Sequence, residues 1–502
     1  MIKQPSRKKA VITQVVGGYL NTGISITQGL LLLPIYFKFI DFATYGYWVT
    51  ITSIIAMLGI VNFGIENMVM QRISSSYAKH NFQAVVDYFI NSQFLYYIIA
   101  CILFIIGLVL SFWLQTILSL GDAQLNLLRQ VYFIALFTAT LTVLSSSVKG
   151  FSQALLKPLF GVYSTVFSRI IGIILTVVLL YQNIGLLSIP IGLFVTEILI
   201  LSSNAIYCFI QYKKLNIKSN LQKNIIFEYL HFSPHFFGFE VGNMLSNKSH
   251  PLIITTILGA EMTTAYSVTR KAVEIIDQVV NTFNSSLVGP FSHLVGEGDI
   301  EKIKKISIKI ISLSFFALMI AFGTYIVTNH LFVSLWINKD IVLSQEIILM
   351  MGFGAIAYSM TRLLRNQLFG LNKFKFSSNM ILIEGLLFVI FAVFLTDIFG
   401  IIGVPFSLLI VSSIIAIFLG LKIITTLGIK YKKQNVYKQL FIVVFIILYL
   451  SIIEKFIQKS WFDFVLFSLV SIIVLSIVIY TINYKYFRNI IKDIKLKGNF
   501  KA

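Results

Sequence analysis

Five basic side chains of this 502-residue chain fall inside long apolar stretches, where a charge is costly. They are Arg169, Arg270, Lys271, Arg362 and Arg365. In hydrocarbon each charge costs from about 2.5 kcal/mol upward, so each needs a partner or a ligand. A guanidinium group donates two parallel hydrogen bonds to phosphate oxygens, and a lysine adds a point charge. The set therefore suits an anionic ligand that carries phosphate.

Uncharged polar side chains recur at helical spacing in two of the apolar stretches. Asn21 and Gln28 lie seven residues apart in the first stretch, and Asn243 and Asn247 lie four apart in a later one. Both spacings place the side chains on one face of a helix. Hydrogen bonds between helices, worth about 0.6 to 2 kcal/mol each, would explain them, and so would the wall of a wet cavity. Because the two stretches correspond in an internal repeat, we favour the cavity.

Three acidic residues, Glu240, Glu274 and Asp277, also lie within the apolar stretches. Intramembrane carboxyl groups commonly mark ion or proton pathways. Any of the three could bind a proton or a sodium ion and couple its movement to that of a ligand.

Structural roles for the same charges stay open. Arg169 could form a buried ion pair with Glu197, and Arg270 could neutralise Glu274, which lies four residues further along the helix. Arg362 and the arginine three residues after it could extend their side chains to the lipid headgroups. In each case the charge would serve packing or anchoring, and no ligand would be required.

Fourteen apolar stretches carry these residues, and each is long enough to cross a bilayer as a helix, which takes roughly 20 residues. The composition agrees, because 57% of residues are hydrophobic and only 12% are charged, about half the charge of a soluble domain. The predicted spans cover about residues 10–37, 45–70, 82–112, 131–148, 159–181, 186–210, 226–247, 263–287, 306–327, 347–369, 380–398, 401–421, 440–457 and 462–482.

The basic residues outside the spans give the chain an orientation. Most of the 40 lysines and arginines fall in every second gap, beginning with the N-terminal tail. Positively charged loops stay on the cytoplasmic side, so we predict that both termini are cytoplasmic. The net charge of +20 then faces anionic membrane lipids, and we expect no nucleic-acid partner.

The positions of the cysteines, the lengths of the loops and the absence of a nucleotide-binding motif disfavour several classes of protein. Both cysteines, Cys101 and Cys208, lie in predicted spans, so we expect neither a disulfide framework nor a metal centre, and no cofactor. The longest outward gap, 113–130, has no room for the outer domain that glycan-building enzymes usually need. No glycine-rich nucleotide loop occurs in the sequence. We therefore predict a protein that is not an enzyme and is driven by gradients.

A weak internal repeat organises the spans. Shifting the chain by 219 residues lays Asn21 on Glu240, Gly23 on Gly242 and Tyr47 on Tyr266. Six spans intervene, so the repeats are parallel, with a pseudo-twofold axis along the membrane normal and a cavity between the halves. The predicted fold is an all-α polytopic membrane protein of 14 transmembrane helices. Its parts are a six-helix lobe (1–212), a second six-helix lobe (213–429), and a basic linker with two extra helices and a cytoplasmic tail (430–502).

Several short motifs in this arrangement resemble a known family. They are Leu33–Pro34 at the end of the first span, Tyr45–Trp48, Val61–Ile65 and Ile257–Glu261. With the 6+6+2 order of spans, they resemble the oligosaccharide and O-antigen flippases of the multidrug/oligosaccharidyl-lipid/polysaccharide exporter superfamily.

The resemblance implies alternating-access transport of a polyprenyl-diphosphate-linked oligosaccharide, of O-antigen or capsule type. The substrate would move from the inner to the outer leaflet of a bacterial or archaeal cytoplasmic membrane, and a glycan polymerase could act as partner. The alternative is a drug/cation antiporter of the same superfamily; these commonly carry an acidic residue in the first span, where this chain has none before Asp41. A membrane glycan polymerase or glycosyltransferase is a further alternative, which the short outer loops disfavour.

Within the flippase interpretation, the basic residues would hold the diphosphate and the amides would contact the sugars. The expected phosphate ligands are Arg169, Arg270, Lys271, Arg362 and Arg365. The expected sugar ligands are Asn21, Gln28, Asn243 and Asn247.

Overall fold

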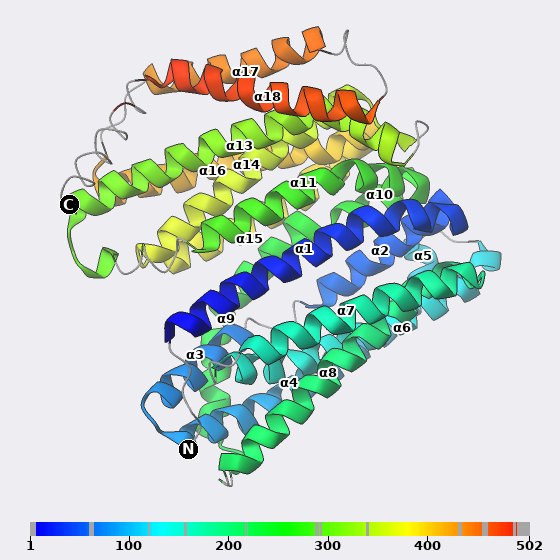
Figure 1. Cartoon of the computed structure of the whole chain (residues 1–502), viewed down its shortest axis with the longest axis vertical. Helices are drawn as coiled ribbons and strands as arrows, with labels where there is room; N and C mark the ends of the chain where they lie inside the picture. The colour runs from blue at the N-terminus through cyan, green and yellow to red at the C-terminus, as the bar shows by residue number, and fades with distance from the viewer. Residues whose placement is uncertain are drawn as a thin grey trace. The chain divides into compact units, whose positions relative to one another are not determined.

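The protein was analysed as a computed structural model, which describes residues 7–484 and 488, except 60–64, 119–120, 155–157, 216, 218, 287–290, 292–293, 338–340, 430–433 and 454–459. Over these residues the chain forms helices and no strands (Figure 1). The predicted all-α class is therefore confirmed.

The helices fall into two compact units by their contacts. Unit 1 comprises Met1–Ser267 together with Ile381–Val393, and unit 2 comprises Val268–Met380 together with Phe394–Ala502. The lobes predicted at 1–212 and 213–429 group the chain by repeat rather than by contact, and they stay a prediction.

The first ten helices lie within unit 1, and α11 begins there. Their bounds are α1 Arg7–Phe39, α2 Phe42–Leu58, α3 Ile65–Ala78, α4 Phe82–Ser111, α5 Leu114–Leu118, α6 Asp122–Ala154, α7 Pro158–Tyr181, α8 Ser188–Leu215, α9 Lys223–Lys248, α10 His250–Leu258 and α11 Ala260–Ser286. The later helices are α13 Ile300–Trp336, α14 Gln345–Gly370, α15 Phe374–Phe399, α16 Gly403–Leu427, α17 Gln434–Ile453 and α18 Trp461–Ile482.

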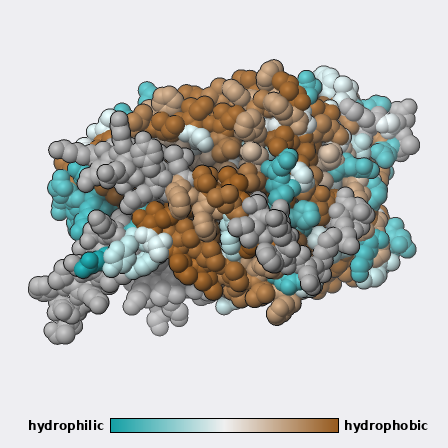
Figure 2. Space-filling view, turned by 90° about the horizontal axis from the view of Figure 1, so that it is seen from above, coloured by the Kyte–Doolittle hydropathy of each residue, from teal (hydrophilic) through white to brown (hydrophobic). Residues whose placement is uncertain are grey.

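Helices lie at every one of the fourteen predicted spans. By length and hydropathy, nine helical segments of the described chain could cross a membrane, and the total of fourteen spans stays a prediction. Large apolar side chains are widely exposed, as Figure 2 shows for one face. Phe462 is 74% exposed and Leu31 is 62% exposed, which is the pattern of a surface solvated by lipid.

One predicted span corresponds to two helices, and one predicted gap contains a short helix. The span predicted at 45–70 is formed by α2 and α3, and α3 carries Glu66, Arg72 and three serines, which are too polar to continue an apolar span. The short helix α10 lies between α9 and α11, with Pro251 in its first turn, where proline is tolerated.

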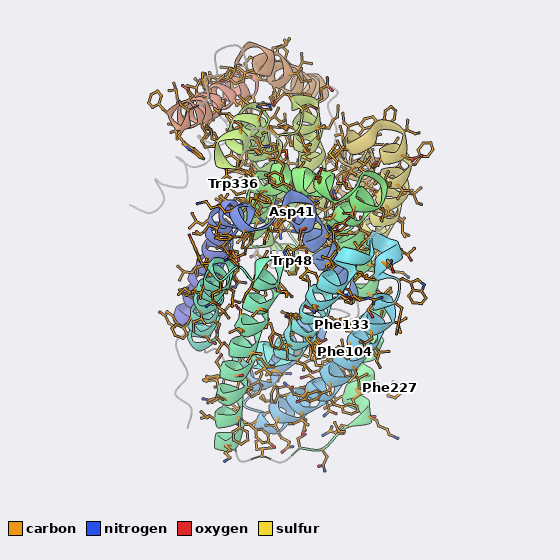
Figure 3. The ribbon with its side chains drawn as sticks, turned by 90° about the vertical axis from the view of Figure 1, so that its right-hand side faces the viewer. Asp41, Trp48, Phe104, Phe133, Phe227 and Trp336 are labelled. Carbon is orange, nitrogen blue, oxygen red and sulfur yellow. The ribbon has the colours of Figure 1, made fainter. Side chains whose placement is uncertain are left out.

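Short polar residues define where several helices begin. The Asp41 carboxylate accepts a hydrogen bond from the Thr44 amide at 2.8 Å and caps α2, on which Trp48 lies further along (Figure 3). The Asn81 side chain caps α4 in the same way, accepting from the Ala84 amide at 3.0 Å. Such caps are each worth about 1 kcal/mol, and they fix where α2 and α4 begin.

Glycines allow close helix contacts in unit 1. A Cβ atom at Gly46 of α2 would collide with the Ala260 carbonyl at the start of α11. One at Gly242 of α9 would collide with the backbone of Ile381 in α15. Small residues are what permit close helix association in lipid, where burial of apolar surface gives little driving force. The second contact packs α9, which carries predicted site residues, closely against α15 within unit 1.

Candidate functional site

Arg169 joins α7 to α1. Its Nη1 donates hydrogen bonds to the Asn21 carbonyl at 3.2 Å and to Ser25 Oγ at 2.6 Å. The carboxylate of Glu197 on α8 also acts electrostatically on this half-buried guanidinium. The structure thus brings together two predicted site residues, Arg169 and Asn21, in an arrangement that also serves packing.

Asn21 retains an available acceptor at this junction. Its Oδ1 is buried and has no hydrogen-bond partner among the described residues. Gln28 lies two turns further along α1 and lines a groove of about 740 Å³ between α1 and α7. Leu31 and Ile173 also line this groove, whose walls are almost wholly apolar. Gln28 therefore lies beside a space suited to hydrocarbon, with few polar neighbours.

The predicted polar face of α9 is present in unit 1. The Asn247 amide donates to the carbonyl of Asn243 at 2.9 Å and to its Oδ1 at 3.0 Å, so the two residues share one face as their spacing predicts. Glu240 lies one turn before Asn243 and is half-buried. In the part of the chain that the structure describes, its carboxylate has no ion pair or hydrogen bond.

In unit 2, α11 carries four predicted site residues. Lys271 Nζ forms an ion pair with Glu274 Oε2 at 3.2 Å, with their side chains 31% and 48% exposed. The pairing of Glu274 with Arg270 that the spacing allowed is not formed. Arg270 is half-buried, and over the described residues it makes neither an ion pair nor a hydrogen bond.

The fourth residue of this face, Asp277, is held by α14. Arg362 Nη2 pairs with Asp277 Oδ2 at 2.5 Å, and the Ser359 hydroxyl donates to Oδ1 at 3.0 Å. The pair is largely buried, because the Arg362 and Asp277 side chains are 19% and 25% exposed. A ligand anion would have to displace Asp277 to reach this guanidinium.

Arg365 lies deeper in unit 2 and is 1% exposed. It therefore does not extend to the headgroups, as the snorkelling alternative required. Tyr358 lies against both arginines, with ring centroids 5.0 Å from the Arg362 guanidinium and 5.7 Å from that of Arg365. Sequence analysis missed Tyr358, although it lies four residues before Arg362 and so on the same helix face.

The described contacts thus join the predicted residues in pairs. These are Arg169 with Asn21, Asn243 with Asn247, Lys271 with Glu274, and Arg362 with Asp277. Gln28, Glu240, Arg270 and Arg365 lie apart from these pairs. Of the charged members, Arg270 and Glu240 are half-buried without a described partner.

Several solved structures share this fold, and they are named as a flippase and transporters. Lipid II flippase MurJ in an inward closed conformation matches with a TM-score of 0.69 and 13% identity, covering 94% of this chain and 99% of that one. An outward-facing multidrug resistance MATE family transporter of the MOP superfamily has a TM-score of 0.59 and 12% identity, covering 83% and 95%. A MOP superfamily transporter from Pyrococcus furiosus has a TM-score of 0.56 and 12% identity, covering 84% and 97%.

At these identities the likeness shows the fold alone, and together with the apolar helices it indicates a multi-pass membrane protein. No individual curated protein matches the chain in sequence. Residues 15–295 match the family described as Polysaccharide biosynthesis protein, which confirms the family resemblance inferred from the sequence. Because that match extends over more than half of its length, the chain belongs to the polysaccharide biosynthesis protein family.

Proposed function

We propose that this protein flips a polyprenyl-diphosphate-linked oligosaccharide, of O-antigen or capsule repeat type, from the inner to the outer leaflet of the cytoplasmic membrane. Family membership and the transporter fold support a glycan-related cargo. The observation that supports an anionic headgroup is the state of Arg270. Its guanidinium is half-buried in an apolar chain, and the described residues give it no counter-charge. Diphosphate would supply that counter-charge by two-point hydrogen bonding.

The phosphate ligands follow from which cations are already engaged. Arg270 would bind first, with Lys271 as its neighbour, since the exposed Lys271–Glu274 pair is weak and easily exchanged. Arg362 would join only by leaving Asp277, which makes it a conditional ligand. Arg169, which already donates to α1, and the buried Arg365 would not make the first contact. The amides of Asn21, Gln28, Asn243 and Asn247 remain the proposed sugar contacts.

The membrane potential favours this direction of movement. An inside-negative potential contributes roughly 2.3 kcal/mol per charge per 100 mV to an anion that moves outward. Among the three acidic candidates, Glu274 and Asp277 are held in ion pairs, which leaves Glu240 as the best-placed carboxylate for a coupling proton or sodium ion. Glu240→Gln should then remove the pH dependence of transport; an unchanged pH profile would exclude Glu240.

The test is genetic complementation in the host from which this gene is deleted. The deletion should lower surface glycan and accumulate lipid-linked oligosaccharide in the inner leaflet. Arg270→Ala should fail to restore surface glycan, by about tenfold or more, at an unchanged membrane protein level. Loss of one charge-assisted contact in a desolvated site is worth about 1.5 to 3 kcal/mol, which gives this size of effect.

Arg129→Ala is the matched control, because Arg129 is also a half-buried arginine but lies near the start of α6, which we predict to face outward. It should complement fully. Wild-type surface glycan with Arg270→Ala would remove Arg270 from the proposal. Normal glycan in the deletion strain, combined with sensitivity to cationic drugs, would favour the antiporter instead.

A further inference from the structure

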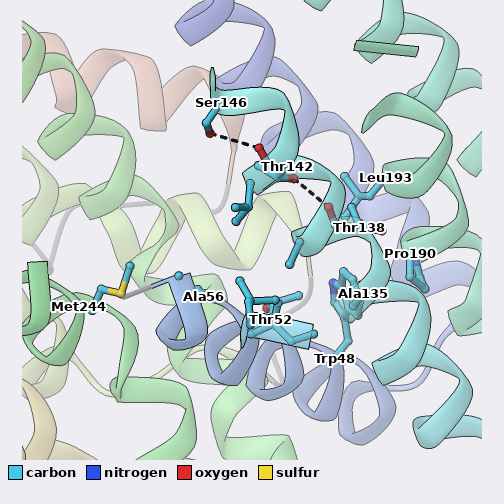
Figure 4. Close-up of a pocket in the computed structure, with 15 residues that line it drawn as sticks. Trp48, Thr52, Ala56, Ala135, Thr138, Thr142, Ser146, Pro190, Leu193 and Met244 are labelled. Carbon is cyan, nitrogen blue, oxygen red and sulfur yellow. Dashed lines mark hydrogen bonds between the residues drawn. The ribbon is translucent and has the colours of Figure 1, made fainter. Parts of the chain in front are cut away.

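Unit 1 contains a pocket, and none of the predicted site residues lines it. It encloses about 370 Å³ between α2, α4, α6, α8 and α9. Trp48 and Thr52 line it from α2, and Thr138, Thr142 and Ser146 line it from α6 (Figure 4). None of the described residues in its wall carries a charge.

The hydroxyl groups of this pocket are already committed as donors. Thr138 donates to the Ile134 carbonyl at 2.8 Å, Thr142 to the Thr138 carbonyl at 2.9 Å, and Ser146 to the Thr142 carbonyl at 3.2 Å. On α2, Thr52 donates to the Val49 carbonyl at 2.8 Å. A hydroxyl has one donor and two acceptor lone pairs, so each oxygen can still accept. The side-chain hydroxyls therefore present a row of acceptors, spaced one helical turn apart on α6.

The hydroxyl groups of this uncharged wall are left to act as acceptors, and that restricts the chemistry of the ligand. Phosphate oxygens are themselves acceptors, so they would find no donor among these hydroxyls. A cationic drug would find no carboxylate to replace its hydration. A saturated hydrocarbon chain would leave the acceptors unused. A pyranose ring supplies hydroxyl donors at its rim and an apolar face of C–H groups.

Trp48 provides the surface that the apolar face of a sugar requires. Trp48 is 6% exposed and lines the pocket together with Thr138 and Thr142 (Figure 4). An indole ring combines a large apolar body with an electron-rich face, which attracts the weakly positive C–H groups of a sugar.

We infer that this pocket is a subsite for an uncharged pyranose ring of the transported glycan, bound by Trp48 and the α6 hydroxyls. The inference rests on the proposed function and deepens it, because it assigns the sugar to a different place from the diphosphate. The headgroup would then be recognised at two chemically distinct sites, a neutral one in unit 1 and a cationic one on α11.

The test follows the fluorescence of Trp48 in purified full-length protein. The chain has four tryptophans, and substituting Trp113, Trp336 and Trp461 by Phe leaves Trp48 as the remaining one. The probe is the oligosaccharide released by acid from the lipid-linked pool of the deletion strain, freed of phosphate. Inorganic diphosphate and tetraphenylphosphonium are tested separately, as anion and as lipophilic cation.

We expect a saturable change in Trp48 fluorescence with the oligosaccharide and none with diphosphate. Thr138→Val together with Thr142→Val should weaken the apparent affinity about tenfold, because two acceptors are lost while shape is kept. Thr140→Val is the matched control, since Thr140 donates to the Leu136 carbonyl at 2.9 Å on the same helix but does not line the pocket. The control should bind as the parent does.

Each outcome decides the inference. No fluorescence change with the oligosaccharide, or equal weakening by Thr140→Val, overturns the subsite. A response to tetraphenylphosphonium alone would make the pocket a site for cations and overturns it too. If the deletion strain accumulates no lipid-linked pool, the proposed function fails by that separate measurement, before any binding is measured.

Discussion

The neutral pocket of unit 1 and the charged face of α11 in unit 2 satisfy their polar groups by different means. In the pocket, each hydroxyl uses the carbonyl of its own helix one turn back, as Thr142 does with Thr138. On the charged face, Asp277 depends on Arg362, which comes from another helix. A hydroxyl can be satisfied locally in hydrocarbon, whereas a charge needs an opposite charge from elsewhere. The pocket can therefore bind a neutral ligand without breaking a contact between helices, whereas a ligand that reaches Arg362 has to break its pair with Asp277.

The largest effect should come from breaking the buried ion pair in unit 2. Arg362→Ala leaves Asp277 without its main counter-charge, and we expect a loss of stability of about 2 kcal/mol. Removing one partner of a fully buried pair costs about 3 to 5 kcal/mol, and the partial exposure of this one reduces that figure. The measurement is the thermal unfolding midpoint in detergent micelles.

Two further variants sharpen this result. Arg362→Leu combined with Asp277→Leu should recover part of the lost stability, because neither charge is then left alone. Lys302→Ala breaks an exposed pair with Glu297, 2.9 Å apart, and should not change the midpoint measurably. If Arg362→Ala unfolds at the parent's temperature, the charged face does not depend on that pair.

A smaller effect should follow at the Arg169 junction of unit 1. Ser25→Ala removes the acceptor that lies 2.6 Å from Arg169 Nη1 but leaves the bond to the Asn21 carbonyl. We expect about 1 kcal/mol of destabilisation, the usual worth of one hydrogen bond. Thr27→Ala, an exposed position on the same helix, is the comparison and should be neutral. Equal midpoints for the two variants would contradict a structural role for Arg169.

The sequence predicted the helices far better than the partners of their side chains. Hydropathy located a helix at every predicted span because length and apolar composition are local properties. The sequence offered Arg270 as the partner of Glu274, but Lys271 forms that pair, since residues three and four apart are both neighbours on a helix.

Long-range partners were beyond sequence reasoning for a different reason. Asp277 and Arg362 are 85 residues apart, and only the packing of α11 on α14 brings them together. The pocket hydroxyls were overlooked because threonine in an apolar helix gives no strong signal. The regular spacing of Thr138, Thr142 and Ser146 was the one sign in the sequence that they share a face.

The smallest effect tests whether the pocket hydroxyls serve ligand binding rather than the fold. Thr142→Val keeps the shape and branching of the side chain and removes a hydroxyl that bonds only within α6 among the described contacts. Because Thr and Val have similar helix propensities, we expect a stability change below about 0.5 kcal/mol.

Thr255→Val is the contrasting variant in the same unit. The Thr255 hydroxyl lies 2.5 Å from Thr50 Oγ1 and 2.6 Å from Thr263 Oγ1, and all three side chains are buried. Its loss removes both contacts between these buried hydroxyls and should cost about 1 to 2 kcal/mol, although Thr50 and Thr263 still donate to the Gly46 and Gly259 carbonyls. A destabilisation by Thr142→Val as large as that by Thr255→Val would mean that the pocket hydroxyls hold the helices together, and the contrast between a neutral binding wall and a structural charged face would not stand.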